Sequence, residues 1–174
     1  MATKRLALVG LTITALAVLL LVPGGAYSIQ GQEHEEMAAV ELHVHMGEFS
    51  FQVDGQEPGM PLEIEAGMPY LLAFHIDGQI VHEAMLGKGV KDEDGMPHGY
   101  ASNLLDNIEV RLIGEMRDSE FEVETMGLIE LELNREQLLE VKFTLPEELA
   151  GEWELGCFIP GHYEAGMKLP IIVN

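Results

Sequence analysis

The chain has 174 residues, and its 30 acidic residues against nine Lys and Arg give a formal net charge of −21. A surface this acidic repels nucleic acid and anionic lipid, which excludes both as partners. The single cysteine excludes an internal disulfide, and the residues that follow the N-terminal segment suffice for one domain with its own core.

The N-terminus has the pattern of an export segment. Lys4 and Arg5 precede an uncharged apolar run over residues 6–22, after which small residues follow. This predicts a signal over residues 1–28, and places the rest of the protein in the periplasm or at the cell surface. The run is also just long enough to span a membrane, so a cleaved signal peptide and a retained anchor both fit. Residues 29–38 are polar and acidic and predict a flexible lead-in.

Residues 39–174 predict one all-β domain. Apolar and polar side chains alternate from Val40 to Met46, as in a half-buried strand, and similar short runs recur between clusters of turn residues. Tyr70–Ile76 is almost continuously apolar, which suits a strand covered on both faces, and Ile80–Leu86 follows as the next strand. We expect about eight short strands in an antiparallel Greek-key β-sandwich.

Residues 87–108 interrupt the alternation. Glycines, a proline and the acidic cluster Asp92–Asp94 predict an irregular excursion, in which a short helix over 100–107 is one alternative. Residues 134–139 predict a connection that holds at most one helical turn. Alternation then returns in Trp153–Cys157, so that Cys157 stands at the inward-facing end of a strand.

The cysteine begins a loop that carries three metal donors. His162 follows Cys157 after four intervening residues, and Met167 follows after four more. A thiolate, an imidazole and a thioether on one short loop suit a copper ion that cycles between Cu(I) and Cu(II), with the thioether as a weak axial ligand. One further histidine would complete such a site, and His82 is the best candidate. The rival His75 lies on an apolar strand, where a hydrogen-bonded core histidine is the expected role.

The segment Cys157–Met167 resembles the copper loop of the cupredoxins, the blue-copper family that includes plastocyanin, azurin and rusticyanin. Residues 81–87 (VHEAMLG) and 151–167 (GEWELGCFIPGHYEAGM) look like the matching segments of secreted bacterial cupredoxin-domain proteins. The resemblance covers roughly residues 38–174. It implies a two-sheet β-sandwich that binds one mononuclear copper ion. The ligands that it implies are His82, Cys157, His162 and Met167.

The chain departs from the family at one position. Many cupredoxins have Asn before the first histidine, and its side chain braces the ligand loop, whereas this chain has Val81. The hydrogen bonding that would hold the first histidine is therefore in doubt. Two further pairs, His43 with His45 and Met96 with His98, are alternatives for a second metal, although a solvated strand face is the favoured interpretation of the histidine pair.

These observations predict a copper protein that is not an enzyme and that carries one electron between redox partners outside the cytoplasm. One domain with one Cys–His–Met loop disfavours a copper oxidase or a nitrite reductase. We expect a monomer whose acidic surface attracts a basic partner, such as a cytochrome or an oxidase. Solubility, or adaptation to a salty medium, is an alternative reason for the same surface charge. The loop residues Phe158, Ile159, Pro160 and Tyr163 are expected to form an apolar docking patch. The alternative is copper delivery, buffering or resistance, because the same ligands serve both roles.

Overall fold

The computed structural model describes residues 37–116, 119–135 and 137–174, and these form twelve strands and one short 3-10 helix. The strands are β1 (Val40–Gly47), β2 (Ser50–Val53), β3 (Leu62–Ile64), β4 (Pro69–Ile76), β5 (His82–Glu93), β6 (Met96–Asn103), β7 (Glu109–Met116), β8 (Ser119–Met126), β9 (Leu131–Leu133), β10 (Leu138–Thr144), β11 (Gly151–Gly156) and β12 (Lys168–Val173). The helix, Glu147–Leu149, leads into β11. The expected eight strands are therefore too few.

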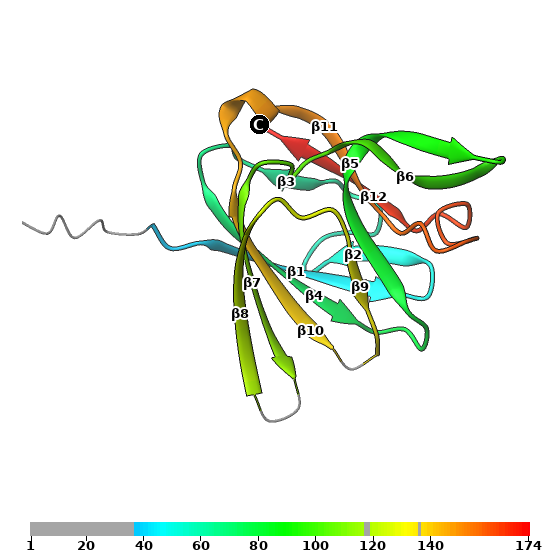
Figure 1. The fold of residues 1–174 in the computed structure, drawn as a ribbon, viewed down its shortest axis with the longest axis horizontal. Coiled ribbons are helices and arrows are strands. Elements are labelled where there is room, and N and C mark those ends of the chain that lie inside the picture. The colour runs from blue at the N-terminus through cyan, green and yellow to red at the C-terminus, as the bar shows by residue number, and fades with distance from the viewer. Residues whose placement is uncertain (1–36, 117–118, 136) are drawn as a thin grey trace, which may run out of the picture. The chain divides into compact units, whose positions relative to one another are not determined.

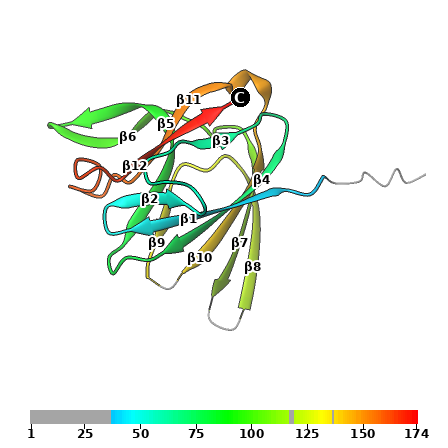
Figure 2. The ribbon, with the colours of Figure 1, turned by 180° about the vertical axis from the view of Figure 1, so that it is seen from behind.

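The strands form two sheets, which Figures 1 and 2 show from opposite sides. The first has the order β2-β1-β4-β10-β7-β8, and the second has the order β3-β12-β11-β5-β6. Strand β9 pairs with the start of β5. The inward residues of both sheets make one apolar core, which includes Phe74, Leu72, Leu155 and Ile171. The predicted all-β sandwich is confirmed.

The sandwich is not wholly antiparallel, which corrects the expectation. Strands β1 and β4 pair in parallel, and so do β3 and β12. The reason lies in the path of the chain: β3, between β2 and β4 in sequence, belongs to the second sheet. The chain thus leaves the first sheet and re-enters it beside β1, a crossover that allows a parallel pair. The alternation within each strand carries no information about such crossings.

The predicted irregular excursion over residues 87–108 is wrong for most of its length. Strand β5 continues to Glu93 and turns directly into β6. The alternative of a short helix over 100–107 is wrong, because the end of β6 and a turn lie there. Asp94 and Gly95 both have positive φ, 55° and 83°, and Glu93 pairs with Met96 across them. Asp-Gly is a favoured sequence for such a two-residue hairpin turn. The dense glycines therefore belong to a bent hairpin, with a register shift between Val90 and Asp92.

The expectation for residues 134–139 is corrected, and those for the N-terminal segment remain predictions. The connection over residues 134–139 contains no helix among its described residues, and β10 already begins at Leu138. The signal or anchor over 1–28 and most of the lead-in over 29–38 lie outside the described residues. In the part of the chain that the structure describes, no helix has the length and apolarity needed to cross a membrane.

Candidate metal centre

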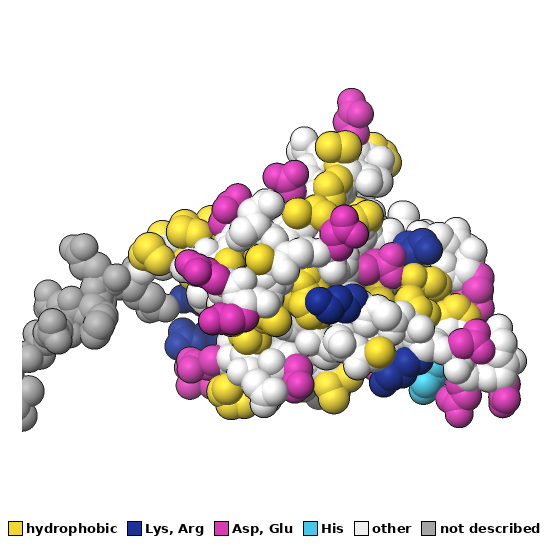
Figure 3. Space-filling view, turned by 90° about the horizontal axis from the view of Figure 1, so that it is seen from above, with side chains coloured by type: hydrophobic (Ala, Val, Ile, Leu, Met, Phe, Trp, Pro, Cys, Tyr) yellow, Lys and Arg dark blue, Asp and Glu magenta, His cyan; other side chains and the backbone are white. Residues whose placement is uncertain are grey.

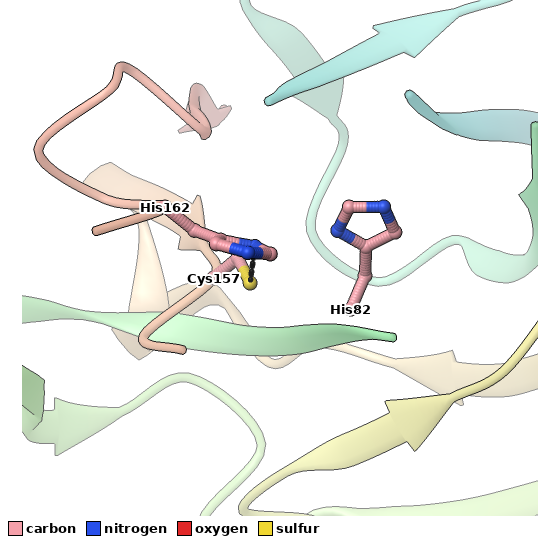
Figure 4. A group of neighbouring side chains, drawn as sticks. All are labelled: His82, Cys157 and His162. Atoms are coloured by element: carbon pink, nitrogen blue, oxygen red, sulfur yellow. Dashed lines mark hydrogen bonds between the residues drawn. The ribbon is translucent and has the colours of Figure 1, made fainter. Parts of the chain in front are cut away.

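Three of the four predicted ligands meet at one end of the sandwich. His82 is the first residue of β5, Cys157 follows the last residue of β11, and His162 lies in the loop that joins β11 to β12. One donor atom from each of the three side chains lies within 4.8 Å of the others. Figure 4 shows the two imidazoles and the sulfur turned toward one shared space. The fourth residue, Met167, is fully buried immediately before β12.

Backbone hydrogen bonds fold the ligand loop back on itself. The Cys157 amide donates to the Met167 carbonyl at 3.2 Å, and the Met167 amide donates to the His162 carbonyl at 3.0 Å. The His162 amide in turn donates to the Ile159 carbonyl at 2.9 Å. Because β11 and β12 pair antiparallel on either side of the loop, its two ends are anchored in one sheet. The loop therefore presents its donors from a rigid base, as a preorganised site requires.

The Cys157 sulfur connects the loop to β5. The backbone amide of Glu83, next to His82, donates to the sulfur at 3.3 Å, and the sulfur lies 3.3 Å from Nδ1 of His162. Strand β5 lies beside β11 in the second sheet, with Met85 opposite Gly156. This pairing is what brings a histidine from residue 82 to a cysteine at residue 157. The prediction that His82 joins Cys157 and His162 is thus confirmed, and the pairing of β5 with β11 is the reason.

His82 supplies the strongest test of whether the site fits a metal. The side chain is fully buried, and among the described residues neither of its ring nitrogens has a hydrogen-bond partner. Buried polar groups are almost always hydrogen-bonded, because an unsatisfied one costs about 1–3 kcal/mol. A metal bound at the nitrogen that faces Cys157 and His162 would satisfy it. The donor set of two imidazoles, a thiolate and a thioether is that of a type 1 copper site, and it fits one copper ion.

Burial also sets the protonation of the donors. It lowers the pKa of His82, and the neighbouring charge of His162 lowers it further, so the ring is held in the neutral form that binds metals. Burial raises the pKa of the Cys157 thiol, against the effect of two backbone amides that point at the sulfur. The thiol thus keeps its proton until a cation displaces it.

The turn between β1 and β2 covers the outer side of the centre, which sequence reasoning missed. The Phe49 ring meets His162 edge to face, with 5.2 Å between ring centroids. The Glu48 carboxylate accepts a 2.7 Å hydrogen bond from the Gln79 amide, in the loop just before His82. This bond ties the loop before His82 to the turn between β1 and β2, which the apolar side chain of Val81 cannot do. Only the tertiary contact identifies Glu48, since nothing local to it in sequence marks it.

Several predicted surface residues have other roles. Phe158 is buried, stacked on Tyr163 with 4.9 Å between centroids, so it cannot line a docking patch. Tyr163 and Tyr100 both donate to Glu154, at 2.6 and 2.9 Å. The exposed apolar residues beside the centre are therefore Phe49 and Pro160, with Ile159 partly exposed.

The remaining histidines also differ from expectation. His75 is not a core residue: it is half-buried, and its Nε2 lies 2.8 Å from Nδ1 of His43. His43 and His45 each stack against the His75 ring. His98 lies on β6, exposed, with a carboxylate oxygen of Glu93 3.6 Å away.

No protein-family model and no curated protein matches this chain. Among solved structures it is similar to a multicopper oxidase from Campylobacter jejuni, with a TM-score of 0.52 and 11% identity over 80% of this chain and 31% of the oxidase. It is also similar to a multicopper oxidase from Pediococcus acidilactici, with a TM-score of 0.53 and 12% identity over 80% of this chain and 27% of the oxidase. The reduced form of rusticyanin gives a TM-score of 0.48 and 20% identity, over 78% of this chain and 79% of rusticyanin.

The likeness to the two oxidases concerns the fold. The chain spans about a third or less of the length of either. At this level of identity it says nothing of activity. What can be said of the chemistry comes from the donors themselves. The described residues contain one group of three His and Cys side chains close enough to share a metal ion.

Proposed function

We propose that this protein, a cupredoxin by its fold and a type 1 copper protein by its donor set, carries single electrons between redox partners outside the cytoplasm. The observation that carries the proposal is the preformed group of His82, Cys157 and His162, held between two paired strands. Donors that need not move on a change of oxidation state keep the reorganisation of electron transfer small. Copper supplies the one-electron chemistry when it is bound.

The rim of the centre supports an exit for the electron through His162. This side chain is 7% exposed, and its ring contacts Phe49, which is 49% exposed. A small apolar surface of Phe49, Ile159 and Pro160 surrounds it, of the kind that short-lived redox encounters use. The proposed role of the residues is thus divided: Cys157 and His82 hold the metal inside the fold, and His162 joins it to the surface.

The proposed partner is a protein with a basic surface, such as a cytochrome or an oxidase. The support is the net charge of −21, and Figure 3 shows Asp and Glu side chains spread over one face with fewer Lys and Arg among them. Near the centre Glu48 and Glu164 are exposed, whereas Glu154 is engaged by two tyrosines. Opposite charges of this kind raise the rate of encounter at low salt. We further propose that the protein acts as an exported monomer and not as an enzyme.

The test is optical and electron paramagnetic spectroscopy of the copper-loaded chain. We expect an intense thiolate-to-copper band that is absent from Cys157→Ser, while His98→Gln, which alters an exposed histidine elsewhere, retains it. Full copper loading without that band in the wild type would contradict the centre.

A second measurement separates electron transfer from copper delivery. A carrier shows reversible voltammetry and keeps its copper in the presence of a Cu(I) chelator. Its reaction with a basic cytochrome slows as ionic strength rises. Rapid surrender of Cu(I) to the chelator would favour delivery or buffering instead.

A further inference from the structure

A stack of three imidazoles lies on the first sheet, separate from the copper centre. His43 and His45 come from β1 and His75 from the parallel strand β4, where His45 and His75 are register partners. The ring centroids of both stacked pairs are 5.0 Å apart, and the planes are within 25° and 15° of parallel. Alternate residues of a strand share one face, so β1 presents both its histidines beside the His75 ring.

The nitrogen atoms of one pair are set for a shared ligand. Nδ1 of His43 lies 2.8 Å from Nε2 of His75. One proton can bridge two ring nitrogens at this distance. Metal–nitrogen bonds of about 2.0 Å put two ligand nitrogens about 2.8 Å apart at the right angle of a tetragonal Cu²⁺ site and about 3.3 Å apart at the tetrahedral angle of Zn²⁺. A small rotation of the two partly exposed rings would therefore aim both lone pairs at one ion.

Carboxylates orient two of the rings. Glu41 Oε1 lies 3.1 Å from Nε2 of His43, and a neutral ring that donates its one N–H there has a lone pair on Nδ1. Asp77 and Asp54 lie 2.8 and 3.0 Å from the two ring nitrogens of His45. His45 is thereby held against the His75 ring by carboxylates and is not itself available as a donor. A carboxylate on the far nitrogen of a ligand histidine is the usual support of a metal site.

We infer that His43 Nδ1 and His75 Nε2 bind a second metal, a divalent first-row ion such as Cu²⁺ or Zn²⁺, at the surface of the first sheet. Imidazole nitrogens suit these ions, and Glu41, Asp54 and Asp77 place negative charge around them. On binding, the proton that His75 Nε2 donates to His43 leaves Nε2, and His75 carries a proton on its own Nδ1 instead. Both ligand rings therefore remain neutral. Water completes the coordination, because both rings are partly exposed. The site needs no contribution from the copper centre and does not rest on the proposed function.

Calorimetric titration of the metal-free, full-length chain with ZnCl₂ tests this site. We expect two equivalents bound by the wild type, since the copper centre also takes Zn²⁺. His43→Gln and His75→Gln each remove one equivalent or weaken it at least about tenfold. His98→Gln is the control and keeps both equivalents, because it changes an exposed histidine of β6 that lies beside the Glu93 carboxylate and is a ligand of neither site. Cys157→Ser removes the other equivalent, so failure of the copper centre and failure of this site give different results.

Nitrogen-15 NMR of the histidine rings supplies an independent readout. On addition of Zn²⁺ we expect His43 Nδ1 and His75 Nε2 to shift together, and the His75 proton to appear on Nδ1. Thermal unfolding in EDTA checks that the variants are folded. Equal stoichiometry and affinity in the wild type, His43→Gln and His75→Gln would overturn the inference, as would a His75 Nε2 that keeps its proton in excess Zn²⁺.

Discussion

At the scale of single residues, the position of the His82 ring depends on the absence of a side chain at Gly78. Gly78, in the loop before β5, leaves space for the imidazole: a methyl group on it would lie 2.8 Å from His82 Nε2 and 3.5 Å from the Glu48 carboxyl carbon. The ring therefore stands where it does because its neighbour has no side chain. A buried ring that is crowded from behind must shift toward or away from the sulfur.

Gly78→Ala is expected to displace His82 and weaken copper binding on the order of tenfold. The copper affinity, measured by competition with a chelator, and the thiolate-to-copper band should both change. Gln79→Ala is the matched control, because it shortens a neighbouring side chain whose partner is Arg135 and keeps the backbone bond to Glu48. Unchanged affinity and spectrum in Gly78→Ala would show that the ring has room to spare.

The second residue considered at this scale is Tyr100, whose hydroxyl donates a hydrogen bond to the Glu154 carboxylate. Burial, and then the charge of Glu154, raise the pKa of Tyr100 far above its usual range. An unfolded tyrosine ionises near pH 10, so above that pH the unfolded state loses a proton that the folded state keeps. Stability is thus fully present below pH ~10 and falls as the pH rises above it.

Tyr100→Phe should lose about 1 kcal/mol of stability at neutral pH through the missing hydrogen bond, yet show a shallower loss above pH ~10. Thermal unfolding between pH 8 and 11.5 measures both effects. Absorbance at 295 nm reports ionised tyrosine alongside it. Ionisation of Tyr100 while circular dichroism still shows a folded protein would contradict the prediction.

At the scale of elements, the β5–β6 hairpin is the feature that local patterns misrepresent. Its strands are mostly exposed beyond Gly87, so apolar alternation is weak there. Its turn depends on two residues with positive φ, Asp94 and Gly95. A β-branched residue at Gly95 would pay the steric cost of the left-handed region, about 1–2 kcal/mol.

Gly95→Val is expected to destabilise the hairpin tip by about 1–2 kcal/mol and to speed amide exchange in residues 90–100. Hydrogen exchange followed by mass spectrometry locates the effect. Met96→Val, on the adjacent strand position without positive φ, is the control and should exchange as the wild type does. Equal exchange in both variants would mean that the turn tolerates a side chain.

At the scale of the whole molecule, a bound metal would link segments that are far apart in sequence. Cys157 and Met167 are fully buried members of the core cluster, and the fully buried His82 is the first residue of β5, beside the end of β11. The three residues meet only in the folded chain. A ligand that binds the folded state alone stabilises it by mass action.

Copper at 100 times its dissociation constant should stabilise the wild type by about 2.7 kcal/mol. Calorimetric melting of the loaded and the chelator-treated protein measures the difference. The comparison within Cys157→Ser should show a much smaller rise, since each variant is compared with its own metal-free form. An equal rise in Cys157→Ser would place the stabilising metal elsewhere.

Local order in the sequence determined the fold class and the loop that carries Cys157, His162 and Met167. Strand alternation and donor spacing are properties of neighbouring residues, so both can be read without knowledge of the rest of the chain. The structure places those three residues on one loop after β11, as the spacing predicts. The same local reading failed over residues 87–108, where exposed strands and a two-residue turn weaken the pattern.

Only the tertiary structure decided which strands pair, and with that which distant side chains meet. It brought His82 rather than His75 to Cys157, because β5 and not β4 lies beside β11. It set His75 between two histidines of β1, through a parallel pairing that no periodicity reveals. It also put Glu48 and Phe49 against the centre. Such contacts depend on the order of strands in a sheet, and alternation records which side chains share a face but not what that face meets.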